Sequence, residues 1–227
     1  MIYFLDTADL SEIERCMDLY PLAGVTTNPS IIAKENKPFA QILRNIRSVI
    51  GDTSLLHAQV IAPDAETMIK EAYALQEIVG ANFVVKIPTT AQGIKAMKVI
   101  AKNRDLPITA TAILSAQQAL MAAVAGASYL APYVNRLDNI GADGVKVVRD
   151  IVQLMKLHQL PAQLLAASFK NVQQVQDVAM TGAQTVTIAP DVFHQLIRHP
   201  LTDSGIAQFV HDWEAVYGPS SNLLTVL

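Results

Sequence analysis

The segment FVVKIPTTAQGIKAMKVIAK, residues 83–102, contains the pattern that decides the fold. It opens with a short apolar run, Phe83–Pro88, of the kind that forms a strand buried on both faces. Helical spacing follows over Thr90–Lys102, with an apolar stripe at Gly93, Ala96, Met97 and Ile100. A buried strand followed by an amphipathic helix is the repeating unit of α/β proteins with a parallel sheet.

The same unit recurs along the whole chain. The candidate strands are Ile2–Asp6, Gly24–Asn28, Leu55–Ile61, Phe83–Pro88, Pro107–Ile113, Tyr129–Val134, Gln163–Ser168 and Thr185–Ala189. No Gly/Ser-rich linker or change in composition divides the chain. Eight strand-helix units without a break predict one α/β domain over residues 1–227, a closed (β/α)₈ TIM barrel.

Helix starts and apolar faces support this organisation. Asp9, Asp64 and Ser115 each precede a helical run and offer a side-chain oxygen to the free N–H groups of its first turn. The helix expected over Asp64–Val79 places on one face Ala65, Met68, Ile69, Ala72 and Leu75.

An extra amphipathic helix is predicted beyond the eighth unit, over Thr202–Tyr217. Its apolar face consists of Ile206, Phe209, Val210 and Trp213. That face either closes the barrel of its own subunit or packs on a neighbouring subunit. The apolar end of the chain, residues 223–227, is compatible with a neighbour.

Composition excludes several classes of function. The 227 residues are 51% hydrophobic and 16% charged, with a formal net charge of -3, so we expect neither a nucleic-acid surface nor a basic membrane patch. The start, MIYFLDTADLSEIER, does not resemble a signal peptide, and no apolar stretch reaches the length of a membrane span. The single cysteine, Cys16, permits no internal disulfide. We therefore expect a soluble cytoplasmic protein.

Polar residues gather at the carboxyl ends of the predicted strands. They are Asp6; Thr26, Thr27 and Asn28; Gln59; Lys86; Thr111; Tyr133, Asn135 and Arg136; and Ser168. In a (β/α)₈ barrel these ends meet on one rim, where the active site forms. Each residue alone is explained by a cap, a turn or a satisfied hydroxyl, but their convergence on one rim predicts a site.

Lys86 is the only amine in this set. Burial disfavours the charged form of a lysine, so a buried lysine becomes a nucleophile. The alternative is that its aliphatic stem packs while its ammonium group reaches solvent at the strand end.

The neighbouring residue types suggest chemistry at a carbonyl group. A deprotonated amine attacks a ketone to give an iminium ion, which acts as an electron sink. Asp6, Tyr133, Thr111 and Gln59 are candidates to move protons directly or through a water. For Asp6 the alternative role is capping the next helix, but Thr7 or Asp9 can do that.

A second group is predicted to bind the substrate. Arg136 can bind a phosphate through its guanidinium group, with a hydroxyl added by Ser168, or it can pair with Asp138. Thr26 and Asn135, on the same rim, are included among the substrate-binding candidates.

No cofactor is expected. None of the five histidines, His57, His158, His194, His199 and His211, lies at a predicted strand end, so no catalytic metal is expected. No glycine-rich phosphate loop of the Rossmann or Walker type occurs. With a metal and a nucleotide cofactor set aside, the expected chemistry is a Schiff base formed directly between Lys86 and the substrate.

Five segments carry a family resemblance: LDTADLSEIE, PLAGVTTNPSII, FVVKIPTTAQGIKA, APYVNRLD and LAASFKNVQQ. They resemble the small transaldolase-like family that includes fructose-6-phosphate aldolase. The resemblance extends from Ile2 to Trp213 and implies a (β/α)₈ barrel, class I aldolase chemistry and ring-based oligomers, commonly decamers, in which the terminal helix crosses to a neighbour.

The resemblance also implies roles for individual residues. Lys86 matches the Schiff-base lysine and Asp6 the carboxylate that holds substrate hydroxyls. Asn28 matches a ligand of a substrate hydroxyl, and Arg136 and Ser168 match the phosphate-binding pair.

Two positions divide the family. Typical transaldolases have glutamate in place of Gln59 and phenylalanine in place of Tyr133, so this chain follows the pattern of the aldolase branch. It departs from that branch at Ala110, where glycine is usual, and at Leu114, where tyrosine is usual. These differences leave the donor preference open.

The sequence therefore favours a class I aldolase that interconverts fructose 6-phosphate with dihydroxyacetone and glyceraldehyde 3-phosphate. The alternatives are a transaldolase that transfers the same three-carbon unit between sugar phosphates, and a barrel that only binds such sugars. Sugar phosphates and dihydroxyacetone are the expected ligands, and no nucleic acid or membrane partner is expected.

Overall fold

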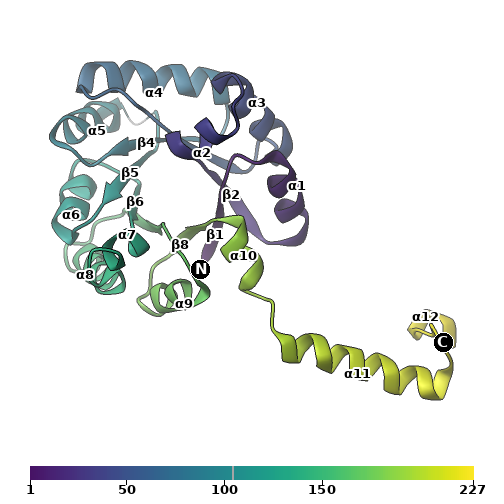
Figure 1. Cartoon of the computed structure of the whole chain (residues 1–227). Helices are drawn as coiled ribbons and strands as arrows, with labels where there is room; N and C mark the ends of the chain where they lie inside the picture. The colour runs from purple at the N-terminus through teal and green to yellow at the C-terminus, as the bar shows by residue number, and fades with distance from the viewer. Residues whose placement is uncertain (104) are drawn as a thin grey trace. The chain divides into compact units, whose positions relative to one another are not determined.

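Eight parallel strands form a closed barrel in the computed structural model, which describes residues 1–103 and 105–227. Each strand pairs with the next in sequence, and β8 closes the ring against β1 (Figure 1). The strands are β1 (Ile2–Asp6), β2 (Leu22–Thr26), β3 (Leu55–Gln59), β4 (Phe83–Pro88), β5 (Ile108–Ile113), β6 (Tyr129–Pro132), β7 (Gln163–Ala166) and β8 (Thr185–Ile188). The predicted (β/α)₈ barrel is confirmed.

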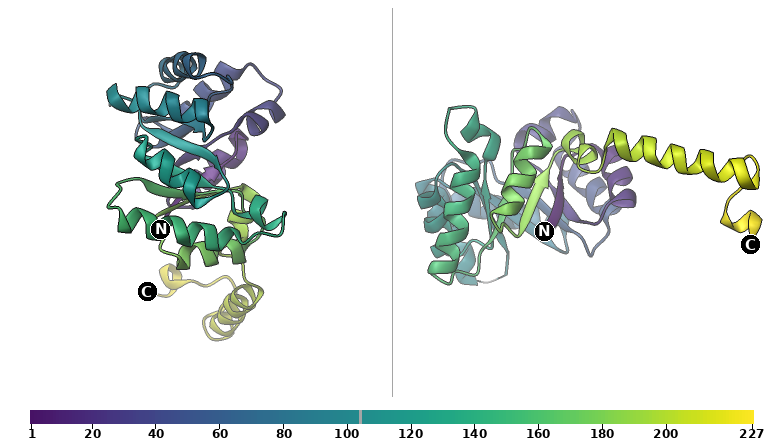
Figure 2. Two further views of the ribbon diagram at one scale, coloured as in Figure 1. Left: turned by 90° about the vertical axis from the view of Figure 1, so that its left-hand side faces the viewer. Right: turned by 90° about the horizontal axis from the view of Figure 1, so that it is seen from below.

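Helices surround this barrel on its outside (Figures 1 and 2). Those that follow the strands are α1 (Leu10–Leu19), α2 (Pro29–Lys34), α3 (Phe39–Ile50), α4 (Ala65–Val79), α5 (Ala91–Asn103), α6 (Ala116–Val124), α7 (Val134–Asp138), α8 (Gly144–Leu157), α9 (Val172–Met180) and α10 (Pro190–Gln195). The short helices α2 and α7 lie in the loops after β2 and β6, and therefore on the rim where the strands end.

The strand boundaries show where local chemistry overrides the apolar pattern. The predicted strands Ile2–Asp6 and Phe83–Pro88 are confirmed to the residue. The second strand ends at Thr26 rather than Asn28, because the Asn28 side chain accepts a hydrogen bond from the N–H group of Ile31 and caps α2. A strand cannot continue through the residue that begins a helix.

The predicted helix starts are confirmed, since Asp9, Asp64 and Ser115 all cap helices through their side chains. The predicted stripe of α5 is also confirmed: its buried residues are Gly93, Ala96, Met97 and Ile100. At Gly93 any larger residue would put a Cβ atom 1.8 Å from the carbonyl oxygen of Pro88, so glycine brings α5 close to the end of β4.

The barrel interior contains buried polar side chains. The Nδ1 atom of His57 on β3 lies 2.9 Å from the Thr109 hydroxyl on β5, and the Thr26 hydroxyl on β2 lies 2.6 Å from that of Thr187 on β8. Neither pair of strands is adjacent, so both contacts cross the interior. All four side chains are buried. Apolar residues such as Leu5, Leu56 and Ile87 fill the core around them.

The chain divides into two compact units, residues 1–193 and 194–227. The second, here called the C-terminal unit, contains the predicted last helix as α11 (Pro200–Tyr217), followed by α12 (Leu223–Val226). Figure 2 shows α11 as one continuous helix. None of the helices in the described ranges is both long enough and apolar enough to span a bilayer.

Candidate active site

A cavity of about 350 Å³ opens where the strands end. Its lining residues are Asp6, Asn28, Pro29, Ser30, Gln59, Lys86, Ala112, Tyr133, Arg136, Ala167 and Ser168. They come from the ends of β1, β3, β4 and β5 and from the segments after β2, β6 and β7. Most of the residues predicted for the site are therefore brought together around one space, as expected for the carboxyl ends of parallel strands.

Lys86 lies on the wall of this cavity and is only 4% exposed. Its Nζ atom donates a hydrogen bond to the carbonyl oxygen of Thr27 at 2.7 Å. Burial lowers the pKa of Lys86, while the Asp6 carboxylate acts in the opposite direction. The alternative in which the ammonium group extends into bulk solvent is wrong for this structure.

The Asp6 carboxylate is held from inside the barrel. Its Oδ1 atom accepts a hydrogen bond from the Thr26 hydroxyl at 2.6 Å, and that hydroxyl in turn accepts from Thr187. Helix α1 is capped by Asp9, so Asp6 is not needed as a cap. Thr26 is not part of the cavity wall and acts on it through Asp6.

Tyr133 connects two parts of the site. Its phenolic oxygen lies 2.9 Å from the Thr111 hydroxyl on β5, and the Arg136 guanidinium carbon lies 4.8 Å from the centre of its ring. A cation over an aromatic face is attracted by the negative face of the ring. Thr111 is buried behind Tyr133 and orients the phenol.

Arg136 and Ser168 lie on the β6–β7 side of the cavity. The backbone N–H group of Asn135 donates to the carbonyl oxygen of Ser168 at 2.7 Å, which joins the two loops. Asp138 accepts hydrogen bonds from Gly144 and Gln174. No ion pair involves Arg136 within the described ranges, so the predicted alternative partner, Asp138, is used elsewhere.

Asn135 takes a different position from the one predicted. It is not among the residues that line the cavity, and its Oδ1 atom accepts a hydrogen bond from Gln174 on α9 at 3.3 Å. In this structure its side chain supports the loop that carries Arg136 rather than facing a ligand.

Two amides complete the opposite wall. The Oδ1 atom of Asn28 is engaged by the N–H group of Ile31 at 3.0 Å, which leaves its NH₂ group to donate to a ligand. Gln59 is the register partner of Lys86 on the neighbouring strand. Both amides thus lie beside the amine.

Several features of the site were not predicted. Ala112 and Ser168 line the cavity with positive φ angles of 57° and 62°, a conformation that is costly for residues other than glycine and that clusters at functional sites. Ser30 also lines the cavity, and its place in the motif GVTTNPS is a signal from which it could have been predicted. The lining alanines could not have been predicted, because an alanine side chain has no reactive or hydrogen-bonding group.

The side chains that line the cavity suit covalent chemistry at the Lys86 amine better than metal binding. Among its lining residues in the described ranges, Asp6 is the one carboxylate, and no histidine is present. A catalytic zinc site uses three protein ligands, commonly histidines with a carboxylate or thiolate. No such ligand set faces this space in the part of the chain that the structure describes.

Comparison with known proteins identifies the family. The fold and the cavity on the strand-end rim define an enzyme-type (β/α)₈ barrel. The family model Transaldolase/Fructose-6-phosphate aldolase matches residues 3–219, and the chain belongs to this family.

One relative and one solved structure illustrate the range of similarity. A probable transaldolase from Symbiobacterium thermophilum is 41% identical over 218 residues, which cover 96% of this chain and 99% of that protein. Thiamine phosphate pyrophosphorylase from Pyrococcus furiosus matches 86% of this chain and 92% of its own, with a TM-score of 0.62 and 16% identity. At that identity the likeness concerns the barrel fold.

Proposed function

We propose that the chain is a class I aldolase that cleaves fructose 6-phosphate to dihydroxyacetone and glyceraldehyde 3-phosphate, and catalyses the reverse reaction. The observation that carries the proposal is the buried amine of Lys86, with a lowered pKa, in a cavity that also contains Asp6, Tyr133 and Arg136. An amine that is uncharged more often is a better nucleophile toward a ketone.

The reaction follows from these positions. The Lys86 nitrogen attacks the C2 carbonyl carbon, and loss of water gives an iminium ion. A base, either Tyr133 oriented by Thr111 or a water held by Asp6 and Gln59, takes the proton of the C4 hydroxyl group. The C3–C4 bond then breaks, its electron pair moves into the iminium to form an enamine, and the aldehyde leaves. Protonation of the enamine at C3 and hydrolysis release dihydroxyacetone and restore the amine.

The remaining residues are assigned to binding. Arg136 and Ser168 hold the phosphate group at one end of the substrate, and Asn28 donates to a hydroxyl group near the reacting carbon. No metal or nucleotide takes part in this scheme. Turnover is therefore expected to be unchanged after treatment with a chelator.

A transaldolase is the second candidate, favoured by the name of the 41% identical relative. It would use the same enamine but pass the three-carbon unit to an acceptor aldehyde such as erythrose 4-phosphate. Tyr133 favours the aldolase, because a phenol near the enamine can supply the proton that lets dihydroxyacetone leave.

Two measurements test these alternatives. Free dihydroxyacetone is measured from fructose 6-phosphate with and without erythrose 4-phosphate, and the aldolase releases it in both cases. Release only after the acceptor is added would identify a transaldolase. Borohydride reduction with dihydroxyacetone, followed by peptide mapping, should place the adduct on Lys86. A chain that gives no adduct would be a sugar-binding barrel without this chemistry.

We also propose that the C-terminal unit assembles copies of the chain, with a decamer of ring type as the expected product. On α11 the side chains of Ile206, Phe209 and Val210 are exposed, as is Leu224 on α12. Contiguous exposed apolar residues mark interaction surfaces. Phe209→Asp is expected to lower the mass measured by light scattering, whereas Gln208→Asp, a neighbouring exposed position, should leave it unchanged.

A further inference from the structure

A glutamine in the first turn of α9, Gln174, joins the two segments that carry the proposed phosphate-binding residues. Arg136 is on the short helix α7 after β6, and Ser168 lies between β7 and α9. Gln174 is half-buried and is not one of the described residues that line the active-site cavity, so it does not face a substrate. Its side-chain amide nevertheless contacts both segments.

The amide oxygen of Gln174 holds the segment after β7. Its Oε1 atom accepts a hydrogen bond from the backbone N–H group of Lys170 at 2.7 Å. The Asn171 side chain caps α9 and accepts a hydrogen bond from the backbone N–H group of Gln174 at 2.9 Å. Both contacts lie just beyond Ser168 in the chain, so the segment that carries Ser168 is fixed to the start of α9.

The amide nitrogen of Gln174 crosses to the segment after β6. Its Nε2 atom donates a hydrogen bond to Asp138 Oδ2 at 2.6 Å and a longer one to Asn135 Oδ1 at 3.3 Å. The other carboxylate oxygen of Asp138 accepts from the N–H group of Gly144 at 2.9 Å. A hydrogen bond to a carboxylate is about twice as strong as one between neutral groups. Arg136 lies between Asn135 and Asp138 in the chain, so the turn that carries it is held to α9 on both sides.

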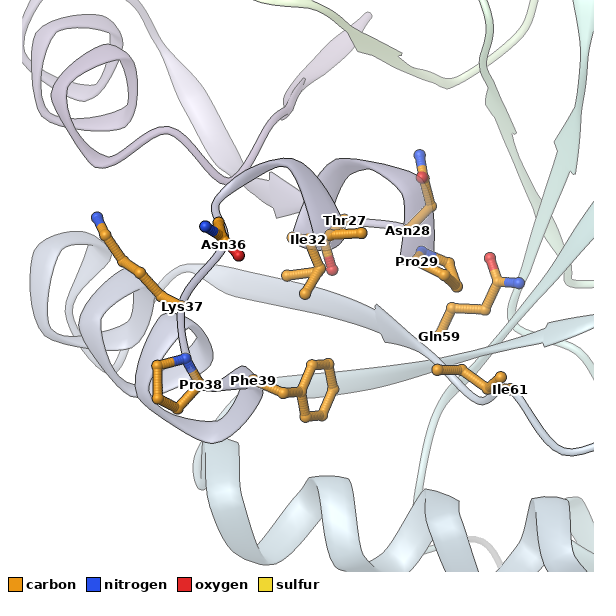
Figure 3. Close-up of a pocket in the computed structure, with 11 residues that line it drawn as sticks. Thr27, Asn28, Pro29, Ile32, Asn36, Lys37, Pro38, Phe39, Gln59 and Ile61 are labelled. Atoms are coloured by element: carbon orange, nitrogen blue, oxygen red, sulfur yellow. The ribbon is translucent and has the colours of Figure 1, made fainter.

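The residues on the other side of the cavity are positioned by local structure. There Gln59 is the last residue of β3, and Asn28 is the residue that begins α2 (Figure 3). Barrel pairing with β4 fixes the first, and its own capping hydrogen bond from Ile31 fixes the second. Arg136 and Ser168 instead belong to two separate connections, so their relative position depends on contacts between those connections.

Backbone hydrogen bonds supply the first of these contacts. They join Val134 to Ala167 at 3.0 Å and Asn135 to Ser168 at 2.7 Å, where the two connections begin. Gln174 adds a second contact farther along, which ties Asp138 on one connection to the start of α9 on the other. Two separated contacts restrict rotation of one connection against the other, which a single contact would permit.

We propose that Gln174 is a positioning residue that holds Arg136 and Ser168 at the separation and orientation that a phosphate group requires. This inference rests on the proposed function, in which these two residues bind the phosphate of the substrate. Two parallel hydrogen bonds from a guanidinium group to a phosphate form only in a defined orientation. Loss of the Gln174 contacts therefore weakens binding of a phosphorylated substrate and spares the chemistry at Lys86.

The first variant of the full-length protein, Gln174→Met, removes the amide without introducing a charge. KM for fructose 6-phosphate should rise by about tenfold, the size of effect expected when hydrogen bonds to a charged group are lost, while kcat changes little. Borohydride trapping on Lys86 with dihydroxyacetone, which carries no phosphate, should give the same yield as in the unsubstituted protein. Gln176→Met, at an exposed position of the same helix, is the matched control and should change neither quantity.

A reversed pair of side chains tests whether Gln174 acts through Asp138. Gln174→Glu places two carboxylates against each other and should raise KM for fructose 6-phosphate at least as much as Gln174→Met. Combining Gln174→Glu with Asp138→Asn restores one amide and one carboxylate with donor and acceptor exchanged. The introduced amide oxygen can still accept from Gly144, and its NH₂ group can donate to the introduced carboxylate. KM in this double variant should return toward that of the unsubstituted protein.

The outcomes separate the role of Gln174 from the proposed function. The positioning role is wrong, and the proposed function stands, if KM for fructose 6-phosphate does not rise in Gln174→Met. The same conclusion follows if the yield of the dihydroxyacetone adduct falls in step with the rise in KM, or if the double variant behaves as Gln174→Glu alone. If the unsubstituted protein forms no dihydroxyacetone adduct on Lys86, the proposed function fails, and the positioning role fails with it.

Discussion

The two rims of the barrel use arginine in opposite ways. At the rim where β3 and β4 begin, the guanidinium group of Arg47 donates hydrogen bonds to the carbonyl oxygens of Gly51, Ser54, Val79 and Asn82. At the rim where the strands end, Arg136 stacks on Tyr133 and has no ion pair among the described residues. The first arginine uses four of its five N–H donors on backbone carbonyl groups, and the second has donors left for a ligand.

This difference separates stability from function on physical grounds. A guanidinium group in contact with backbone carbonyls ties α3 and α4 to the starts of two strands, so its loss leaves buried acceptors without partners. A guanidinium group that faces a cavity contributes little to the stability of the fold. It can bind an anion in a bidentate manner, through two parallel hydrogen bonds. The same asymmetry is general in (β/α)₈ barrels, where the strand-end rim carries the site and the other rim supports the fold.

The largest expected effect is on the strand-end rim. Lys86→Met should remove the borohydride adduct and lower the rate of cleavage by on the order of 10⁴-fold or more, because no other lysine among the described residues lines the cavity. The apolar side chain suits the buried strand, so the thermal midpoint should not fall. Activity and thermal unfolding are measured together, with the exposed Lys95→Met on α5 as the control. Retained adduct in Lys86→Met would show that another group is the nucleophile.

The converse result is expected on the opposite rim. Arg47→Met should lower the free energy of unfolding by about 3 kcal/mol, since several buried carbonyl groups lose a charged donor. The rate per folded molecule should be unchanged. Arg44→Met, at an exposed position of the same helix, provides the matched control in denaturant unfolding. If Arg47→Met lost activity but no stability, the proposed separation of the two rims would be wrong.

Several residues that the structure gathers at the strand-end rim carry a local signal in the sequence. Lys86 stands out as a charge in an apolar run, and Asp6 and Tyr133 follow similar runs. The contact between His57 and Thr109 was not predicted, because it joins two strands that are not neighbours and are 52 residues apart. Arg47 gives no signal either, since an arginine in an amphipathic helix is ordinarily exposed. Its partners are backbone carbonyls of turns, which residue types do not reveal.

A smaller effect is expected within the site. Tyr133→Phe removes the phenol that contacts Thr111 and should shift the ratio of cleavage to transfer toward transfer by about tenfold, the size of effect expected for one hydrogen-bonding group. Released dihydroxyacetone and transferred product are measured in the same reaction with erythrose 4-phosphate. Thr111→Val keeps the phenol but removes its partner, so it should produce a smaller shift in the same direction. An unchanged ratio in Tyr133→Phe would refute the role given to the phenol.

The smallest effect concerns the interior between the two rims. Burial lowers the pKa of His57 well below its ordinary value, and the positive charge of Lys86 adds to this shift. The ring packs against Phe4 and Tyr129 at centroid distances of 5.1 Å and 5.3 Å, and its Nε2 atom is buried without a hydrogen-bond partner. The folded state therefore holds His57 neutral, while the unfolded chain takes up a proton near pH 6.5.

The sign of the pH dependence follows from these two states. Because the unfolded state binds more protons below about pH 6.5, the stabilisation is complete above that pH and is lost as the pH falls toward the folded-state pKa. Between pH 7.5 and pH 6 the free energy of unfolding should drop by about 0.8 kcal/mol from this residue alone. His57→Phe should flatten the profile over this interval, whereas His158→Gln, at an exposed position after α8, should not. If the free energy of unfolding changed equally with pH in His57→Phe and in the unsubstituted protein, the folded barrel would have to accept the protonated form of His57. Water would then have to reach the barrel interior between the two rims.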